Sequence, residues 1–159
     1  MRPSTTAHPF AAVAAAVLLL AVVGPSGAPA QDKAAEVQER QDAMKKNGDS
    51  AKAIAAFVKG EGGSVEDVRA AARNIHEVSG RILELFPEGT EAGVSDSHAK
   101  PEIWQNWGAF QQVATGFPEA ADGLAQAAEA GERAQIAAAF GEVGRVCTTC
   151  HDRYRVPYD

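Results

Sequence analysis

The segment from Glu132 to Arg155 reads ERAQIAAAFGEVGRVCTTCHDRYR. Its larger apolar residues and its two cysteines recur at alternating steps of four and three: Ile136, Phe140, Val143, Cys147, Cys150 and Tyr154. This spacing places all of them on one face of an α-helix, where they can pack against a core. The segment therefore predicts an amphipathic helix whose cysteines lie on its buried side.

Within this helix, Cys147, Cys150 and His151 form a C-x-x-C-H run, which is the sequence that attaches c-type haem. On a helix the three residues fall within roughly 60° of one face, so a single ring can meet both thiols and the imidazole. The thiols would form thioethers with the haem vinyl groups, and His151 would bind the iron. The predicted cofactor is therefore one covalent haem c.

Three other chemistries use the same pair of thiols. A zinc site needs about four Cys or His ligands, and this chain has two cysteines and four histidines with no second ligand pair. A thioredoxin-type dithiol should open a helix after a strand, whereas this pair lies nine residues from the C-terminus of a chain in which no strand is predicted. A plain structural disulfide is the third alternative. We favour haem attachment over all three.

The N-terminal residues read as a secretory leader. Phe10 to Val23 is an almost unbroken apolar run, and Ala28-Pro29-Ala30 suits cleavage before Gln31. The run is shorter than the roughly 20 residues of a membrane span, although an uncleaved anchor is the alternative. We expect residues 1–30 to be a cleaved signal peptide and residues 31–159 to form one domain, exported to the periplasm without a membrane anchor.

The expected mature chain is acidic. Removing Arg2 with the leader leaves 14 basic and 21 acidic side chains, so the net charge changes from −6 to −7. Such a charge disfavours nucleic acid and anionic membrane surfaces as partners. A redox protein with a basic or locally positive surface is the partner that we expect.

Three further helices are predicted before the C-terminal one. They cover residues 32–59, Ser64 to Phe86, and Pro101 to about Leu124, with a kink near Phe117 because Pro118 interrupts the pattern. A loop is expected over residues 87–100.

Two details concern the first two of these helices. Ser64 and Asp67 nearly match a capping box, and Gly48 is expected to loosen or bend the first helix. Four amphipathic helices with mostly short connections bury their apolar faces most simply as an antiparallel four-helix bundle. The predicted fold class is therefore all-α, with the haem attached inside the bundle.

Three features of the chain occur together in one known family. They are the C-terminal C-x-x-C-H run, the sequence Arg40-Gln41-x-x-Met44 on the first helix, and Lys100-Pro101-Glu102-Ile103-Trp104 at a loop-to-helix junction. Together they resemble the class II c-type cytochromes, the cytochrome c′ family, over essentially the whole mature chain. The resemblance implies that Cys147 and Cys150 hold the haem and that His151 is the proximal ligand.

The resemblance also implies roles for three residues of the first helix. Arg40 and Gln41 match a pair near the haem edge, where the guanidinium would bind a propionate. The alternative for Arg40 is an ordinary surface charge. Met44 matches the position that faces the iron from the distal side, where it would be an iron ligand, a lid over the iron or a flexible core residue.

Two branches of the family differ at this position. In the low-spin branch a methionine ligates the iron and the protein carries electrons, whereas in the cytochromes c′ proper the iron is five-coordinate, high-spin and open to NO or CO. The runs Gln41 to Gly48 and Leu85 to Glu88 look more like the low-spin branch. We therefore expect a one-electron carrier with His151 and Met44 as axial ligands, and a five-coordinate protein that binds NO or CO is the alternative.

No enzymatic activity is expected, because the sequence contains no Ser/His/Asp set, paired-carboxylate motif or phosphate loop.

His98 would approach a propionate or, as a weaker alternative, the iron. Arg155 either matches a basic residue that the family places beside the proximal histidine, or it is an exposed C-terminal charge that interacts favourably with the helix dipole. The family often dimerises through its first two helices, so a homodimer is a further expectation.

Overall fold

The structure, a computed structural model, describes residues 28–157 of the 159-residue chain, with side chains from residue 32 onward. Its long helices are α1 (Ala28–Lys59), α2 (Val65–Gly80), α5 (Gly116–Ala130) and α6 (Arg133–Tyr154). Two short helices, α3 (Glu102–Gln105) and α4 (Trp107–Ala114), precede α5. Residues 28–157 contain no β-strand, only an isolated antiparallel bridge between Ala99 and Arg155.

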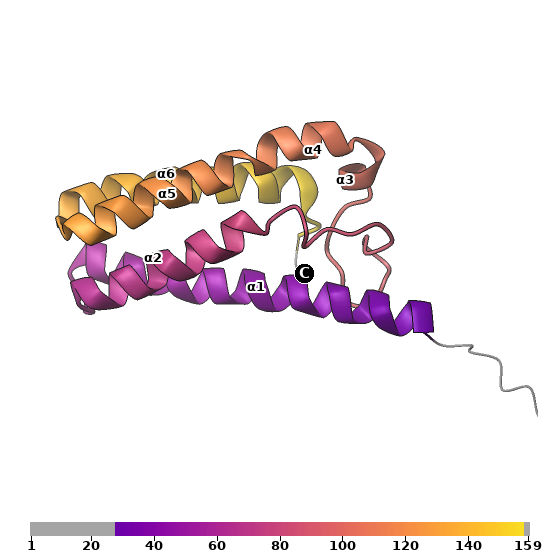
Figure 1. The fold of residues 1–159 in the computed structure, drawn as a ribbon, viewed down its shortest axis with the longest axis horizontal. Coiled ribbons are helices and arrows are strands. Elements are labelled where there is room, and N and C mark those ends of the chain that lie inside the picture. The colour runs from indigo at the N-terminus through magenta and orange to yellow at the C-terminus, as the bar shows by residue number, and fades with distance from the viewer. Residues whose placement is uncertain (1–27, 158–159) are drawn as a thin grey trace, which may run out of the picture.

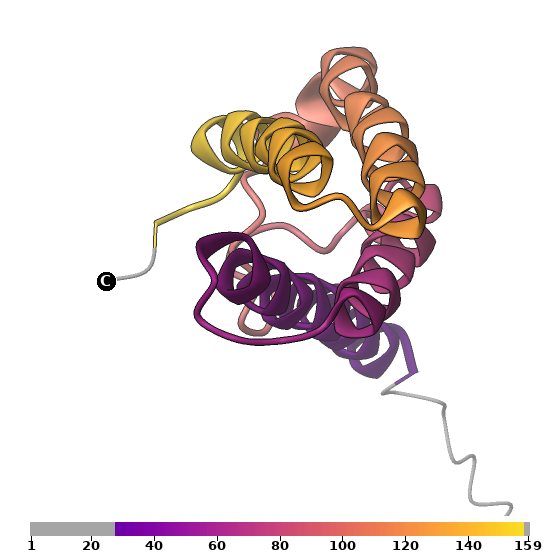
Figure 2. The same cartoon turned by 90° about the vertical axis from the view of Figure 1, so that its left-hand side faces the viewer.

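The long helices run in alternating directions, as Figure 1 shows. In the view along the bundle, α1 packs beside α2, α2 beside α5 and α5 beside α6, and α6 returns to the side of α1 (Figure 2). Every neighbouring pair is therefore antiparallel. The predicted all-α antiparallel four-helix bundle is confirmed.

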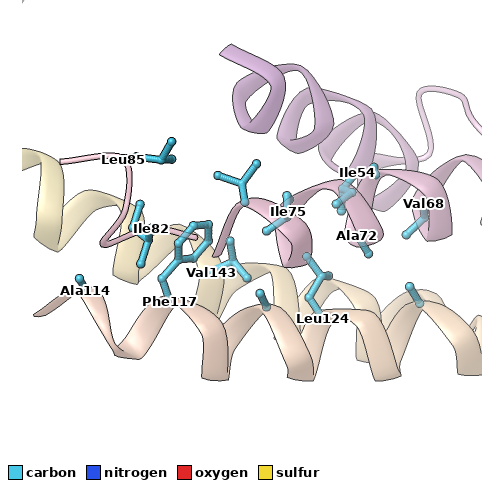
Figure 3. Packing of buried hydrophobic residues seen from close by; sticks show 14 of the residues in the cluster. Ile54, Val68, Ala72, Ile75, Ile82, Leu85, Ala114, Phe117, Leu124 and Val143 are labelled. Atoms are coloured by element: carbon cyan, nitrogen blue, oxygen red, sulfur yellow. The ribbon is translucent and has the colours of Figure 1, made fainter. Parts of the chain in front are cut away.

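The core lies between these helices. Apolar side chains of α2 and α5 meet along its centre, where Ile75 and Leu124 are buried, and Ile54 of α1 and Val143 of α6 complete the packing (Figure 3). The stripe predicted for the C-terminal helix turns inward as expected. Ile136, Val143 and Tyr154 are buried. Phe140, Cys147 and Cys150 are half-buried and pack against the same core.

The first helix continues through the glycine that was expected to loosen or bend it. Gly48 does not end α1, which is a single helix from Ala28 to Lys59, and the predicted loosening or bend stays a prediction. Residues 1–27 of the predicted leader lie outside the described residues, and residues 28–30 form the start of α1. In the described part of the chain, no helix combines the length and the hydrophobicity that crossing a membrane requires.

The second helix is shorter than predicted, because it ends at Gly80 and not near Phe86. The Ser79 hydroxyl donates to a carbonyl of the preceding turn at 2.7 Å, and the next residue, Gly80, is a poor helix former. Both residues therefore disfavour continuation of the helix beyond this point. The chain then proceeds in tight turns, yet Ile82 and Leu85 remain buried. The apolar pattern predicted their burial correctly, but it could not locate the end of the helix.

The third predicted helix consists of three pieces. One break falls at Thr115, close to the kink predicted near Phe117, and Pro118 lies in the first turn of α5, where a missing amide N–H costs nothing. The other break, at Asn106, was not predicted. Asn106 has a non-helical φ of −139°, and its side chain accepts a hydrogen bond from Ala109 N, so it caps the start of α4.

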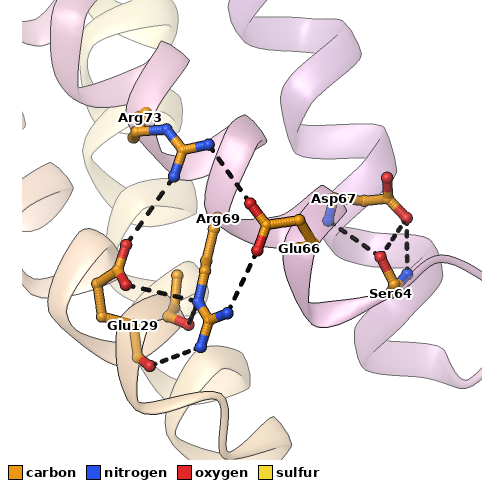
Figure 4. Close-up of polar contacts among 7 residues, drawn as sticks. Ser64, Glu66, Asp67, Arg69, Arg73 and Glu129 are labelled. Atoms are coloured by element: carbon orange, nitrogen blue, oxygen red, sulfur yellow. Dashed lines mark hydrogen bonds and ion pairs between the residues drawn. The ribbon is translucent and has the colours of Figure 1, made fainter.

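Arg69 connects α2 to the end of α5, as Figure 4 shows. Its Nε donates to Ala128 O at 3.2 Å and its Nη2 donates to Glu129 O at 2.9 Å, so it satisfies two terminal carbonyls of α5. Glu66 and the carboxylate of Glu129 pair with the same guanidinium. This arrangement fixes one end of the bundle without taking part in the site described below.

The predicted capping box at the start of α2 is confirmed. Ser64 Oγ accepts from Asp67 N at 3.2 Å, and Asp67 Oδ2 accepts from Ser64 N at 2.8 Å (Figure 4).

We expect Ser64→Ala to lower the free energy of unfolding by about 1 kcal/mol, because it removes the acceptor for a terminal N–H of the helix. Urea unfolding of the holoprotein measures this loss. Ser64→Thr keeps a hydroxyl and serves as the control, with a loss of only a few tenths of a kcal/mol. Equal losses in both variants would show that the cap does not stabilise α2.

Candidate haem site

A cavity of about 760 Å³ opens between α1 and α6, and the loop before α3, the end of α4 and the start of α5 also line it. This volume lies within the roughly 300–1,000 Å³ typical of cofactor pockets. The structure brings every predicted site residue to its wall: Arg40, Gln41, Met44, Cys147, Cys150 and His151. Residues about a hundred positions apart in the sequence therefore share one site.

The two cysteines lie on the α6 wall as free, half-buried thiols. Burial raises the pKa of Cys147, and burial together with the neighbouring Cys147 raises the pKa of Cys150 to about 11. Both groups are therefore uncharged at neutral pH. A thioether that replaces either thiol leaves no buried charge behind, so the wall suits covalent attachment of an apolar ring.

His151 follows directly on the same wall. Its burial, and then the positive charge of Arg155, lower the pKa of the imidazole. The ring is consequently neutral at pH 7, which is the form that can donate a nitrogen lone pair to a metal. The structure thus presents a neutral imidazole beside two neutral thiols.

Met44 lies on the opposite wall, on α1, where it is half-buried and packs against the core cluster. It is the only methionine among the described residues. Asn47, one turn further along α1, also lines the cavity, and its buried Oδ1 has no hydrogen-bond partner among the described residues. Asn47 was not predicted as a site residue, although its position three residues after Met44 places it on the same face of the helix.

Arg40 is buried, with 5% of its surface exposed, so the alternative of an ordinary surface charge is wrong. Its Nη1 donates to Leu85 O at 3.1 Å and Thr90 Oγ1 at 2.7 Å, and its Nη2 donates to Thr90 O and Ser97 Oγ, each at 2.8 Å. The guanidinium also lies 4.9 Å from the centre of the Phe86 ring. Both arms of Arg40 therefore hold the loop beside the cavity, and propionate binding by this residue stays a prediction.

Gln41 ties α1 to the same loop, because its Nε2 donates to Asp96 O at 2.8 Å. Its predicted contact with the haem edge also stays a prediction. The loop is bonded to α6 in turn, since Lys100 N donates to Tyr154 O at 2.9 Å and Val156 N donates to His98 O at 2.8 Å. The loop thus bridges the two helices that form the walls of the cavity.

The zinc and disulfide alternatives find no support in this geometry. In the part of the chain that the structure describes, no three His, Cys, Asp or Glu side chains gather closely enough to hold a metal ion, and the two thiols are not joined. The site fits a haem, because it combines neutral thiols, a neutral imidazole and a large cavity with a buried donor. That donor is the buried hydroxyl of Tyr154, a residue of the cavity wall, and it has no partner among the described residues.

An antiparallel four-helix bundle with C-x-x-C-H on its last helix defines a class of c-type haem proteins. A family model described as Cytochrome C′ matches residues 35–155, which is most of the chain. The protein therefore belongs to the cytochrome c′ family, and it carries the one covalent haem c of that family.

Several relatives share this architecture. Cytochrome c′ of Pararhodospirillum photometricum is 36% identical over 76% of this chain and 96% of its own length. A cytochrome c-556 of Agrobacterium tumefaciens strain B2A is 36% identical over 77% of this chain and 98% of its own length.

Two solved structures of cytochrome c prime variants from Alcaligenes xylosoxidans are also similar, each with 31% identity and each covering 82% of this chain and 98% of that one. One is a nitric oxide complex with a TM-score of 0.70, and the other has carbon monoxide bound and a TM-score of 0.71. These comparisons support the family and its cofactor, but they do not support the expected low-spin branch with Met44 as a ligand.

Proposed function

We propose that this protein binds a small diatomic gas, NO or CO, at a five-coordinate haem iron whose proximal ligand is His151. The observation that carries the proposal is that similar proteins, aligned over most of the chain, have been solved with nitric oxide and with carbon monoxide bound. This proposal takes the place of the His/Met electron carrier as the leading function. The protein is proposed as a binding protein and not as an enzyme.

The residues of the cavity suit this function. Cys147 and Cys150 anchor the ring from α6, and the neutral His151 beside them provides the proximal nitrogen. Phe117 and Val113 add apolar surface to the wall, which favours neutral gases over charged ligands. When bound, the haem supplies an iron atom that binds a diatomic ligand and exchanges one electron.

Met44 acts as a lid in this proposal. Its long, flexible side chain lies on the wall opposite His151, where it restricts access to the distal side without closing it permanently.

The same position supports a second candidate function. A thioether is a soft ligand suited to haem iron, and Met44 faces the cavity from the helix opposite His151. With Met44 bound, the protein would be a one-electron carrier between redox partner proteins. The acidic character of the chain, with 21 acidic against 15 basic side chains, would suit a basic partner surface.

Variants of Met44 separate the two functions. In the gas-binding proposal, Met44→Ala removes the lid and raises the CO association rate constant at least about tenfold, which corresponds to 1.4 kcal/mol of barrier, while the haem stays high-spin. Met44→Leu keeps the volume without the sulfur and should behave like the wild type. Stopped-flow mixing with CO and optical spectra measure both effects. A change from low-spin to high-spin in both variants would instead make Met44 an iron ligand.

The remaining properties belong to the same proposal. We place the mature protein in the periplasm after removal of residues 1–30, supported by the apolar run and small-residue cleavage site at the N-terminus. A homodimer is supported by a related cytochrome c′ structure described as showing ligand-controlled dimer dissociation, and the family resemblance implies an interface through α1 and α2. Nucleic acid is not proposed as a partner.

A further inference from the structure

Tyr154 carries a polar group for which the structure shows no partner. Its side chain is only 5% exposed, and its hydroxyl is buried without a hydrogen bond among the described residues. The residue lines the cavity between α1 and α6. Because a buried hydroxyl without a partner is costly, such groups in folded proteins nearly always meet a protein group, a water or a ligand.

The rest of the residue is held firmly in place. Its ring packs edge-on against Phe110, with 5.3 Å between the ring centres and 84° between their planes, and the Arg153 guanidinium lies 5.2 Å from the ring centre. Its backbone carbonyl accepts from Lys100 N at 2.9 Å. The hydroxyl therefore cannot reach bulk solvent without disturbing the packing of the ring, so a partner has to come to it, and the cavity that Tyr154 lines is the space beside it.

The position of Tyr154 along α6 indicates which part of the haem it meets. Tyr154 lies seven residues, or two helical turns, beyond Cys147, which is about 10 Å along the same face of the helix. The cysteines attach to the vinyl carbons on one edge of the ring, and the two haem carboxylates lie on the edge away from them. A ring attached at the cysteines and bound at its centre by His151 would extend along α6 past that histidine, which would bring its carboxylate edge to the side of Tyr154.

The chemistry of the haem agrees with this placement. An iron-bound haem with ionised carboxylates offers hydrogen-bond acceptors and no donors, and a phenol O–H is a donor. The carboxylates can therefore satisfy Tyr154, whereas they cannot satisfy the acceptor oxygen of Asn47, the other unpartnered buried atom of the cavity.

We propose that the Tyr154 hydroxyl donates a hydrogen bond to a haem carboxylate and thereby positions the haem between α1 and α6. A donor on the carboxylate withdraws negative charge from the neighbourhood of the iron, so it favours the ferrous form. The inference rests on the covalent haem but not on the occupant of the distal side, and it holds for a gas-binding protein and for an electron carrier alike.

Tyr154→Phe in the holoprotein tests the proposal, because it removes one oxygen and keeps the ring that packs on Phe110. We expect the carboxylate bands of the haem in resonance Raman and infrared spectra to shift, and the shift that the wild type shows in D₂O to disappear. The equilibrium between ferrous and ferric haem should move toward the ferric form by roughly threefold. The effect is small because the lost hydrogen bond is only somewhat more favourable in the ferrous state than in the ferric state.

Thr149→Val is the matched control. It also removes a hydroxyl from α6, but the Thr149 side chain is exposed, donates to Arg145 O at 2.9 Å and does not line the cavity. Its haem bands and redox equilibrium should equal those of the wild type. Unchanged carboxylate bands in Tyr154→Phe, or a higher melting temperature of that holoprotein, would overturn the proposal, since both would mean that the hydroxyl has no partner. Failure of the wild type to bind CO would count against the gas-binding function alone.

Discussion

Replacing His151 with alanine is expected to abolish proximal ligation while leaving the haem attached to the chain. The two thioether links, through Cys147 and Cys150, do not depend on the imidazole, so the pigment stays with the protein during purification under denaturing conditions. The iron, however, loses the only histidine that lies on the same wall as the attachment cysteines. The variant should therefore show a different optical and EPR spectrum at full haem content.

A matched histidine provides the control for this experiment. His76 lies on α2, outside the cavity, and its Nε2 is 2.7 Å from Asp122 Oδ1 on the surface between α2 and α5. His76→Ala should keep the wild-type spectrum. Added imidazole should restore part of the spectrum of His151→Ala, because the side chain that it replaces leaves a cavity. A native spectrum in His151→Ala without imidazole would remove His151 from the proximal role.

Replacing Arg40 with alanine is expected to lower the free energy of unfolding by about 3–5 kcal/mol, the cost of truncating one partner in a buried, charged hydrogen-bond network. The loss would leave Leu85 O, Thr90 O and the Ser97 hydroxyl without the donors that now hold them. Burial lowers the pKa of the Arg40 guanidinium, which nevertheless remains charged at neutral pH and depends on these acceptors. Urea unfolding of the holoprotein measures the effect.

Two further variants make this test specific. Arg40→Lys keeps the charge but loses the forked geometry of the guanidinium. Its free energy of unfolding should therefore lie between those of the wild type and Arg40→Ala. Arg73→Ala removes an exposed arginine whose ion pairs to Glu66 and Glu129 measure 3.8 and 4.0 Å, and it should cost less than about 1 kcal/mol. Equal losses in Arg40→Ala and Arg73→Ala would contradict the role of Arg40 in holding the loop.

Local patterns in the sequence predicted most of the fold. The alternating spacing of α6 located its buried face correctly, since residues three and four apart share a helix face whatever surrounds them. The end of α2 was predicted wrongly, because Ile82 and Leu85 continue the apolar pattern after the backbone has left the helix. Burial and helicity are separate properties, and the spacing of apolar residues reports the first more directly than the second.

The site was predicted less completely. Cys147, Cys150 and His151 lie within one short motif, so their proximity needs no knowledge of the fold. The acceptors of Arg40 lie 45 to 57 residues further along the chain, and only the fold brings them together. The missing partner of the Tyr154 hydroxyl likewise emerges only from the packing around it.

The proposed function depends on how many ligands the haem iron has, and spectra of the purified wild-type holoprotein determine that number. Optical and EPR spectra would be recorded in both oxidation states, with and without CO. We predict a high-spin haem whose ferrous spectrum changes on addition of CO. A low-spin spectrum with a methionine-to-iron charge-transfer band and no response to CO would contradict the proposed gas-binding function and make Met44 the sixth ligand of an electron carrier.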